Sequence, residues 1–100
     1  MKALLVVFHL PEGTLKGQHN QFRRKIYGEK TSSWEGRYNY RRKGLLDGIP
    51  HVFLYWGIII IKKEDFKRLE RELQSLSAII KTRIIECIPE DIQKLELGSH

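Results

Sequence analysis

Apolar residues occur in short runs that predict the strands of a small sheet. Lys2–Leu10 (KALLVVFHL) is apolar almost throughout and closes at Pro11-Glu12-Gly13, which is typical of a central strand buried on both faces. His51–Trp56 (HVFLYW) and Ile58–Lys63 (IIIIKK) predict two further strands separated by Gly57. Ala78–Ile88 mixes β-branched and charged residues, which favours a strand with one half-exposed face.

Helical spacing is present in two segments between these strands. In Gln18–Tyr27, Phe22 and Ile26 share one face at i and i+4, and Gly28 ends the helix. A second helix starts at Glu64-Asp65, where the helix dipole favours acidic residues, and ends at Ser77. Its apolar stripe is Phe66, Leu69, Leu73 and Leu76. Pro89-Glu90-Asp91 predicts a last short turn of helix.

The order β-α-insert-β-β-α-β predicts an α+β domain of the ferredoxin-like class, covering residues 1–97. In that class a four-stranded antiparallel sheet carries two helices on one face. The first and third strands are central, and here they are the most uniformly apolar, which agrees with the topology. The insert after the first helix, Glu29–Gly48, has no clean period and predicts a long irregular segment, with Tyr38-Asn39-Tyr40 as a short strand. Gly98-Ser99-His100 is interpreted as a tag remnant.

Charge is concentrated in this same part of the chain. Nine basic residues stand against two acidic ones between Lys16 and Lys43, a net charge of +7. The other residues comprise nine basic and ten acidic side chains and carry −1. The formal charge of +6 therefore comes from one cluster, which suits a polyanionic partner.

Aromatic residues are interleaved with these cations, and they narrow the class of polyanion. Flat rings beside cations suit unpaired bases, so the sequence predicts binding of RNA or single-stranded DNA, with binding weakened by salt. Tyr38, Tyr40 or Trp34 would stack on bases. The predicted nucleic-acid-binding residues are Arg23, Arg24, Arg37, Tyr38, Tyr40, Arg41, Arg42 and Lys43. A solvated basic loop whose rings pack onto the sheet is the competing interpretation.

Whether the protein is an enzyme is left open by the sequence. A metal-independent ribonuclease would use His51 or His19 as general acid or base, with Arg41 or Arg42 stabilising the charge on phosphorus. A metal-dependent ribonuclease is the other form of this alternative. No cofactor is indicated, and no metal ligands are assigned, because His9, His19 and His51 are separate in sequence. A regulatory or protein-interaction module is the third hypothesis.

Several broader expectations follow from composition. The one cysteine, Cys87, excludes an intrachain disulfide, and it is expected to be a small apolar residue. The longest apolar runs are shorter than the ~20 residues that cross a bilayer, so no membrane partner is expected and a cytoplasmic location is the default. Abundant Lys, Arg and Glu, with only two Asn, favour a thermophilic source.

The apolar opening strand, the length and the element order resemble the small CRISPR-associated ferredoxin-fold proteins, which dimerise and were first viewed as endoribonucleases. That family carries an aspartate, proposed as a metal ligand, at the end of its first strand, whereas the matching segment here is Phe8-His9-Leu10-Pro11. The resemblance implies a dimeric protein associated with nucleic acid, while the missing aspartate argues against metal-dependent cleavage. The last strand, as an exposed edge, is the predicted homodimer interface.

Overall fold

The computed structural model describes the backbone of residues 1–33 and 38–97, and the side chains of residues 1–29 and 41–96. The described chain forms an α+β fold. Its elements in order are β1 (Lys2–His9), α1 (Lys16–Tyr27), β2 (Glu29–Ser33), β3 (Tyr38–Arg42), the 3₁₀ turn η1 (Leu45–Gly48), β4 (His51–Tyr55), β5 (Ile58–Ile61), the 3₁₀ turn η2 (Lys63–Asp65), α2 (Phe66–Ser75), β6 (Ile79–Glu86) and α3 (Pro89–Leu97).

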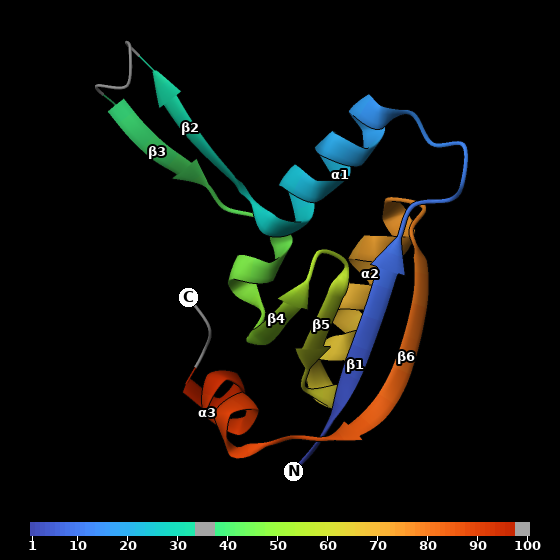
Figure 1. Ribbon diagram of the computed structural model, residues 1–100, viewed down its shortest axis with the longest axis vertical. Helices are drawn as coiled ribbons and strands as arrows, with labels where there is room; N and C mark the ends of the chain where they lie inside the picture. The colour runs from blue at the N-terminus through green and yellow to red at the C-terminus, as the bar shows by residue number, and fades with distance from the viewer. Residues whose placement is uncertain (34–37, 98–100) are drawn as a thin grey trace.

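Four strands form an antiparallel sheet in the order β4-β5-β1-β6 (Figure 1). The two most apolar strands, β1 and β5, lie in the middle, which confirms their prediction as central strands. β6 lies at one edge, as predicted, and β4 at the other. The sequences of central strands are apolar because both faces of these strands are covered by other parts of the chain.

One face of the sheet carries the main hydrophobic core. Val6 of β1 pairs with Ile59 of β5, so the two side chains lie on the same face. Ile26 of α1 and Leu69 and Leu73 of α2 pack in the same cluster, and all of these side chains are fully buried. Figure 1 shows α2 behind the sheet and α1 across one end of it. Both helices therefore contribute to one core.

The opposite face is partly covered by α3. Fully buried Leu95 of this helix packs with Ala3, Val52 and Ile60, which lie on β1, β4 and β5. The sequence predicted only a short turn of helix here, on a fold with both helices on one face. α3 is longer than the predicted turn, because the apolar side chain of Leu95 packs into a second core on the other side of the sheet.

The insert differs from its prediction as a long irregular segment. β2 and β3 pair antiparallel from Glu29 opposite Arg42 to Ser33 opposite Tyr38, so the segment is a hairpin (Figure 1). Tyr38-Asn39-Tyr40 was correctly predicted as part of a strand. The remainder was missed because backbone pairing between polar residues leaves no hydrophobic period to detect.

The ends of α2 follow from its sequence. The acidic residues Glu64 and Asp65 lie in η2, immediately before the helix, where they oppose the positive end of its dipole. Ser77 has φ 62°, a left-handed conformation that ends helices, as expected from the pattern. Among the described residues, no helix is both long and apolar enough to span a membrane.

The docking of α3 on the sheet can be tested by truncating its buried leucine. Leu95→Ala should lower the free energy of unfolding by about 2–5 kcal/mol, because it leaves a cavity in the second core. The control is Ile88→Ala, whose side chain is 57% exposed and whose loss should change stability by less than about 0.5 kcal/mol. Urea unfolding measures both values, and equal stability of the two variants would contradict the packing of α3.

Candidate nucleic-acid interface

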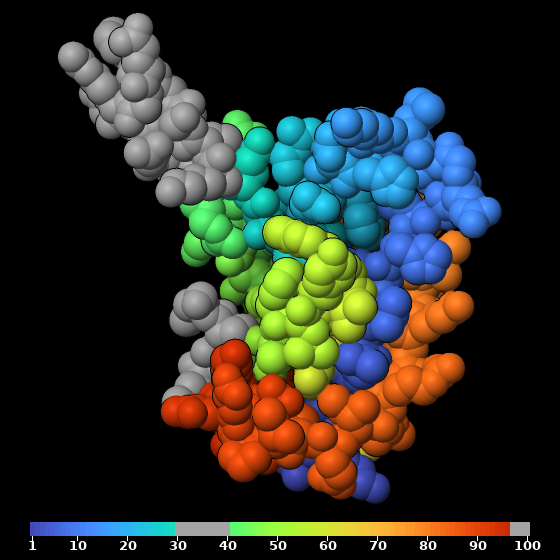
Figure 2. Space-filling model, in the orientation of Figure 1, coloured from blue at the N-terminus to red at the C-terminus, as the bar shows by residue number. Residues whose placement is uncertain are grey.

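The basic residues of the Lys16–Lys43 segment lie on the surface at one end of the molecule. Seven of the nine have described side chains, and all seven are exposed. They come from α1 and from residues 41–43 at the end of the hairpin. Figures 1 and 2 show α1 and the base of the hairpin together at the end opposite α3. The positive charge that is concentrated in one segment of the sequence is therefore also concentrated at one end of the folded molecule.

For three predicted site residues the structure describes no side chain. Arg37 lies outside the described residues, and Tyr38 and Tyr40 have a described backbone in β3 but no described side chains. Trp34 also lies outside the described residues. Base stacking by these rings stays a prediction.

A second group of aromatic residues lies beside the basic end, and the sequence analysis did not assign it to the site. The Tyr27 ring contacts Trp56 and Phe53 edge to face, with ring centroids 4.8 and 5.7 Å apart, and stacks on Phe8 at 6.2 Å. Phe53 and Trp56 are each 47% exposed, and Tyr55 is 65% exposed. The detectable signal was the aromatic density of HVFLYW, which the sequence analysis attributed to strand packing alone.

Arg23 joins the basic residues to these rings. Its guanidinium carbon lies 4.4 Å from the centroid of the Trp56 ring, a cation–π contact. Such contacts contribute about 0.5–1 kcal/mol at exposed sites. The contact leaves a planar cation and an aromatic ring stacked together at the surface, on α1 and at the end of β4.

Arg41 ties the base of the hairpin to the rest of the fold. It donates from Nη1 to Asp47 Oδ1 at 2.8 Å and from Nη2 to the Tyr27 carbonyl at 2.9 Å. Asp47 also accepts the Gly44 backbone N–H at 2.6 Å. Partial burial of the Asp47 carboxyl opposes ionisation, but the bonds from Arg41 and Gly44 outweigh it and lower the pKa of Asp47 below 3.8. Arg41, predicted only as a phosphate contact, thus has a structural role.

Two glycines let the ends of the insert meet. Gly28 ends α1 with φ 84°, and its N–H donates to the Arg24 carbonyl at 2.8 Å. A Cβ on Gly28 would overlap the Arg42 carbonyl, and one on Gly44 would overlap the Gly28 nitrogen. Only glycine allows the two backbone segments to approach each other this closely. The chain therefore leaves the fold and re-enters it at nearly the same point.

The predicted histidines line two separate cavities. His51 lines one of about 300 Å³ together with Arg41, Tyr27 and Lys94. Its Nδ1 lies 2.8 Å from the Ile49 carbonyl, which can only accept, so this nitrogen donates. His19 instead lines a cavity of about 160 Å³ with His9. In the described part of the chain, no three His, Cys, Asp or Glu side chains gather in a way that could hold a metal ion.

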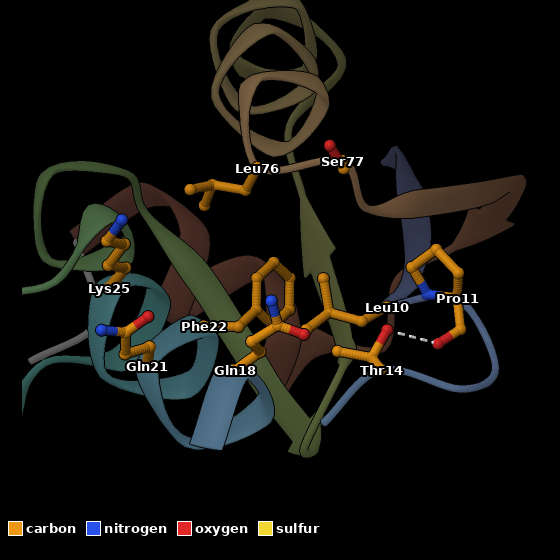
Figure 3. A pocket seen from close by; sticks show the side chains of 9 residues that line it. All are labelled: Leu10, Pro11, Thr14, Gln18, Gln21, Phe22, Lys25, Leu76 and Ser77. Carbon is orange, nitrogen blue, oxygen red and sulfur yellow. Dashed lines mark hydrogen bonds between the residues drawn. The ribbon is translucent and has the colours of Figure 1, made fainter. Parts of the chain in front are cut away.

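A third cavity, of about 360 Å³, lies between α1 and the end of α2 (Figure 3). Phe22 and Leu76 give it an apolar wall, while Gln18, Gln21 and Lys25 supply amide and ammonium groups. Phe22 also lines the cavity that holds His9 and His19. The cavity between α1 and α2 is also lined by Leu10, Pro11 and Thr14, and the Thr14 hydroxyl donates to the Pro11 carbonyl at 2.6 Å. This cavity is a partly polar hollow on the side of α1 that faces α2.

Comparisons of the chain with protein-family models, with curated proteins and with solved structures find no match.

The central position of Tyr27 can be tested through its hydroxyl, which accepts the Gly57 N–H at 2.6 Å. Tyr27→Phe keeps the ring and should lower the free energy of unfolding by about 1 kcal/mol at neutral pH. Burial raises the pKa of Tyr27 above 10.0, more than the Gly57 N–H and Arg23 lower it. The protonated phenol therefore stabilises the fold fully below pH 10, and this contribution is lost as the pH rises through the higher folded pKa.

Urea unfolding between pH 8 and pH 11 measures this difference. The fall in stability above pH 10 should be steeper in the unmodified protein than in Tyr27→Phe. Tyr55→Phe, at an exposed position, serves as the control and should leave neutral-pH stability unchanged. Parallel stability curves for the unmodified protein and Tyr27→Phe would show that the phenol is not held as described.

Proposed function

We propose that the protein binds RNA or single-stranded DNA through a basic-aromatic face. This face comprises Arg23, Arg24, Arg42, Lys43, Phe53 and Trp56. The observation that carries the proposal is the contact of Arg23 with Trp56, which places one cation of α1 directly on an exposed ring. Tyr38, Tyr40 and Arg37 extend this face if they act as the sequence predicts.

The charge balance supports an anionic ligand. Two acidic residues with described positions lie among these cations, and each already has a basic partner. Glu29 pairs with Arg24 at 3.6 Å, and Asp47 pairs with Arg41 at 2.8 Å. No described ion pair engages Arg42 or Lys43, so their charges are available to phosphates.

The exposed rings support a single strand as the ligand. Bases in a duplex are stacked on one another and offer their faces to no side chain, whereas unpaired bases stack on aromatic rings and on guanidinium planes. Phe53 and the Arg23–Trp56 pair present both kinds of surface. Stacking on these groups would not depend on the tyrosines of β3.

The finer architecture belongs to the same proposal. The strand order and the shared core of α1 and α2 support a ferredoxin-like domain in which the hairpin is an insert and α3 an addition. A homodimer through β6 is supported by the edge position of that strand and by Ile84, which is exposed on it. Kinship with the CRISPR-associated proteins is proposed on this architecture alone.

Replacing Arg42 and Lys43 with alanine tests the proposal without disturbing the Arg41–Asp47 contact. The double variant should bind a mixed single-stranded oligonucleotide pool more weakly, and the slope of log affinity against log salt should fall by about 1–2. The matched control is Lys67→Ala with Arg71→Ala on α2, which removes the same charges from an exposed helix elsewhere.

Fluorescence anisotropy over a salt series provides both quantities. Equal losses in the two double variants would mean that net charge alone causes binding. No binding by the unmodified protein would overturn the proposed function.

A ribonuclease is the second candidate, favoured by the cavity that His51 shares with Arg41. In this candidate His51 would take the proton of an RNA 2′-hydroxyl, and Arg41 would stabilise the charge on phosphorus. If so, labelled RNA should be cut with and without chelator, and His51→Gln should abolish cutting while binding persists. RNA that stays intact with the unmodified protein would exclude this candidate.

A further inference from the structure

The small cavity beside Trp56 brings together two histidines that are distant in sequence. His9 comes from the end of β1, His19 and Arg23 come from α1, and Trp56 and Gly57 come from the turn between β4 and β5. No motif in the sequence pairs these two histidines. The structure does, because α1 crosses the end of β1 where the β4–β5 turn also lies.

The electrostatics of this cavity favour an anion. Arg23 supplies a permanent charge, and histidine is the side chain that ordinarily gains a charge between pH 8 and pH 5. No carboxylate is among the described residues that line the cavity. Of the surrounding elements, the β4–β5 turn adds no charge, and the β6 residue paired with His9 is Ile79.

Charged residues on neighbouring segments that do not line the cavity are of both signs. Lys81 lies on β6, on the same face of the sheet as His9, and adds to the positive potential. Glu12 lies in the turn after β1, is exposed and does not line the cavity. Protonation of both histidines would therefore add two charges to a site that is already cationic.

The orientation of His9 is set by its own backbone. Its Nδ1 lies 3.0 Å from the Leu10 carbonyl, which can only accept a hydrogen bond, so Nδ1 carries the proton in the neutral ring. A second proton would bind at Nε2 and turn that atom into a donor.

The size of the cavity limits what it can hold. Sites for whole small molecules measure about 300–1,000 Å³, whereas this one measures about 160 Å³. A single phosphate group suits that space better than a nucleoside. A base attached to the phosphate would lie outside, next to the Arg23–Trp56 pair.

We infer that this cavity binds one phosphate group of the nucleic-acid strand, held by Arg23 and by protonated His9 and His19. The inference rests on the proposed function and deepens it, since it assigns a phosphate subsite and a pH dependence to the face. Binding strengthens as the histidines gain charge, because each then donates a charge-assisted hydrogen bond to phosphate.

The test compares pH 6 with pH 8 at constant ionic strength, using single-stranded oligonucleotides with a 5′-phosphate or a 5′-hydroxyl. Affinity of the unmodified protein should be about tenfold higher at pH 6. In His9→Gln with His19→Gln, which keeps hydrogen-bonding groups but not the charge, the ratio should fall towards one. Lys67→Ala with Arg71→Ala, the control pair on α2, leaves both histidines in place and should keep the tenfold ratio.

The outcomes separate this inference from the proposed function. Binding that is salt-dependent but has the same pH ratio in the unmodified protein and in the double histidine variant overturns the phosphate subsite alone. No binding of any oligonucleotide at either pH overturns the proposed function as well. A preference for the 5′-phosphate that disappears in the double variant identifies the phosphate as a strand end. Equal binding of both oligonucleotides, with the pH ratio still lost in that variant, identifies it as internal.

Discussion

Tyr27 is the residue on which the arrangement of the basic end depends. Its ring packs between β1 and the end of β4, its hydroxyl accepts the Gly57 N–H, and its carbonyl accepts a hydrogen bond from Arg41. One residue at the end of α1 thereby connects the helix, the sheet edge, the β4–β5 turn and the hairpin. The hydroxyl is partly buried, and its bond fixes the local geometry because leaving a partly buried polar group without a partner is costly.

This connection holds cations from two separate segments side by side. The insert leaves the fold at Gly28 and returns at Gly44, whose backbones approach too closely for a Cβ. Arg42 and Lys43 are therefore placed near the end of α1. Charges that oppose them are already paired, as Asp47 is with Arg41, so the positive potential of this end is only partly cancelled.

Much of the framework could be predicted from local patterns. The apolar strands β1 and β5 were expected at the centre, and the Leu69–Leu73 stripe of α2 was expected in the core, because burial on both faces or along one stripe produces a readable period. The β2–β3 hairpin left no such period, because its strands pair through their backbones and carry mostly polar residues. The length of α3 was missed because the second core that binds Leu95 exists only once the sheet has formed.

The sequence by itself determined the strands of the main sheet and the helices α1 and α2, and it determined that positive charge is concentrated between Lys16 and Lys43. Both properties are local, since they depend on residues that are neighbours along the chain. Only the tertiary structure decided that Arg23 lies over Trp56, that Arg41 pairs with Asp47 and that His9 meets His19. These contacts depend on strand register, on the glycine crossing and on the path of α1 over the sheet, and no spacing along the chain encodes them.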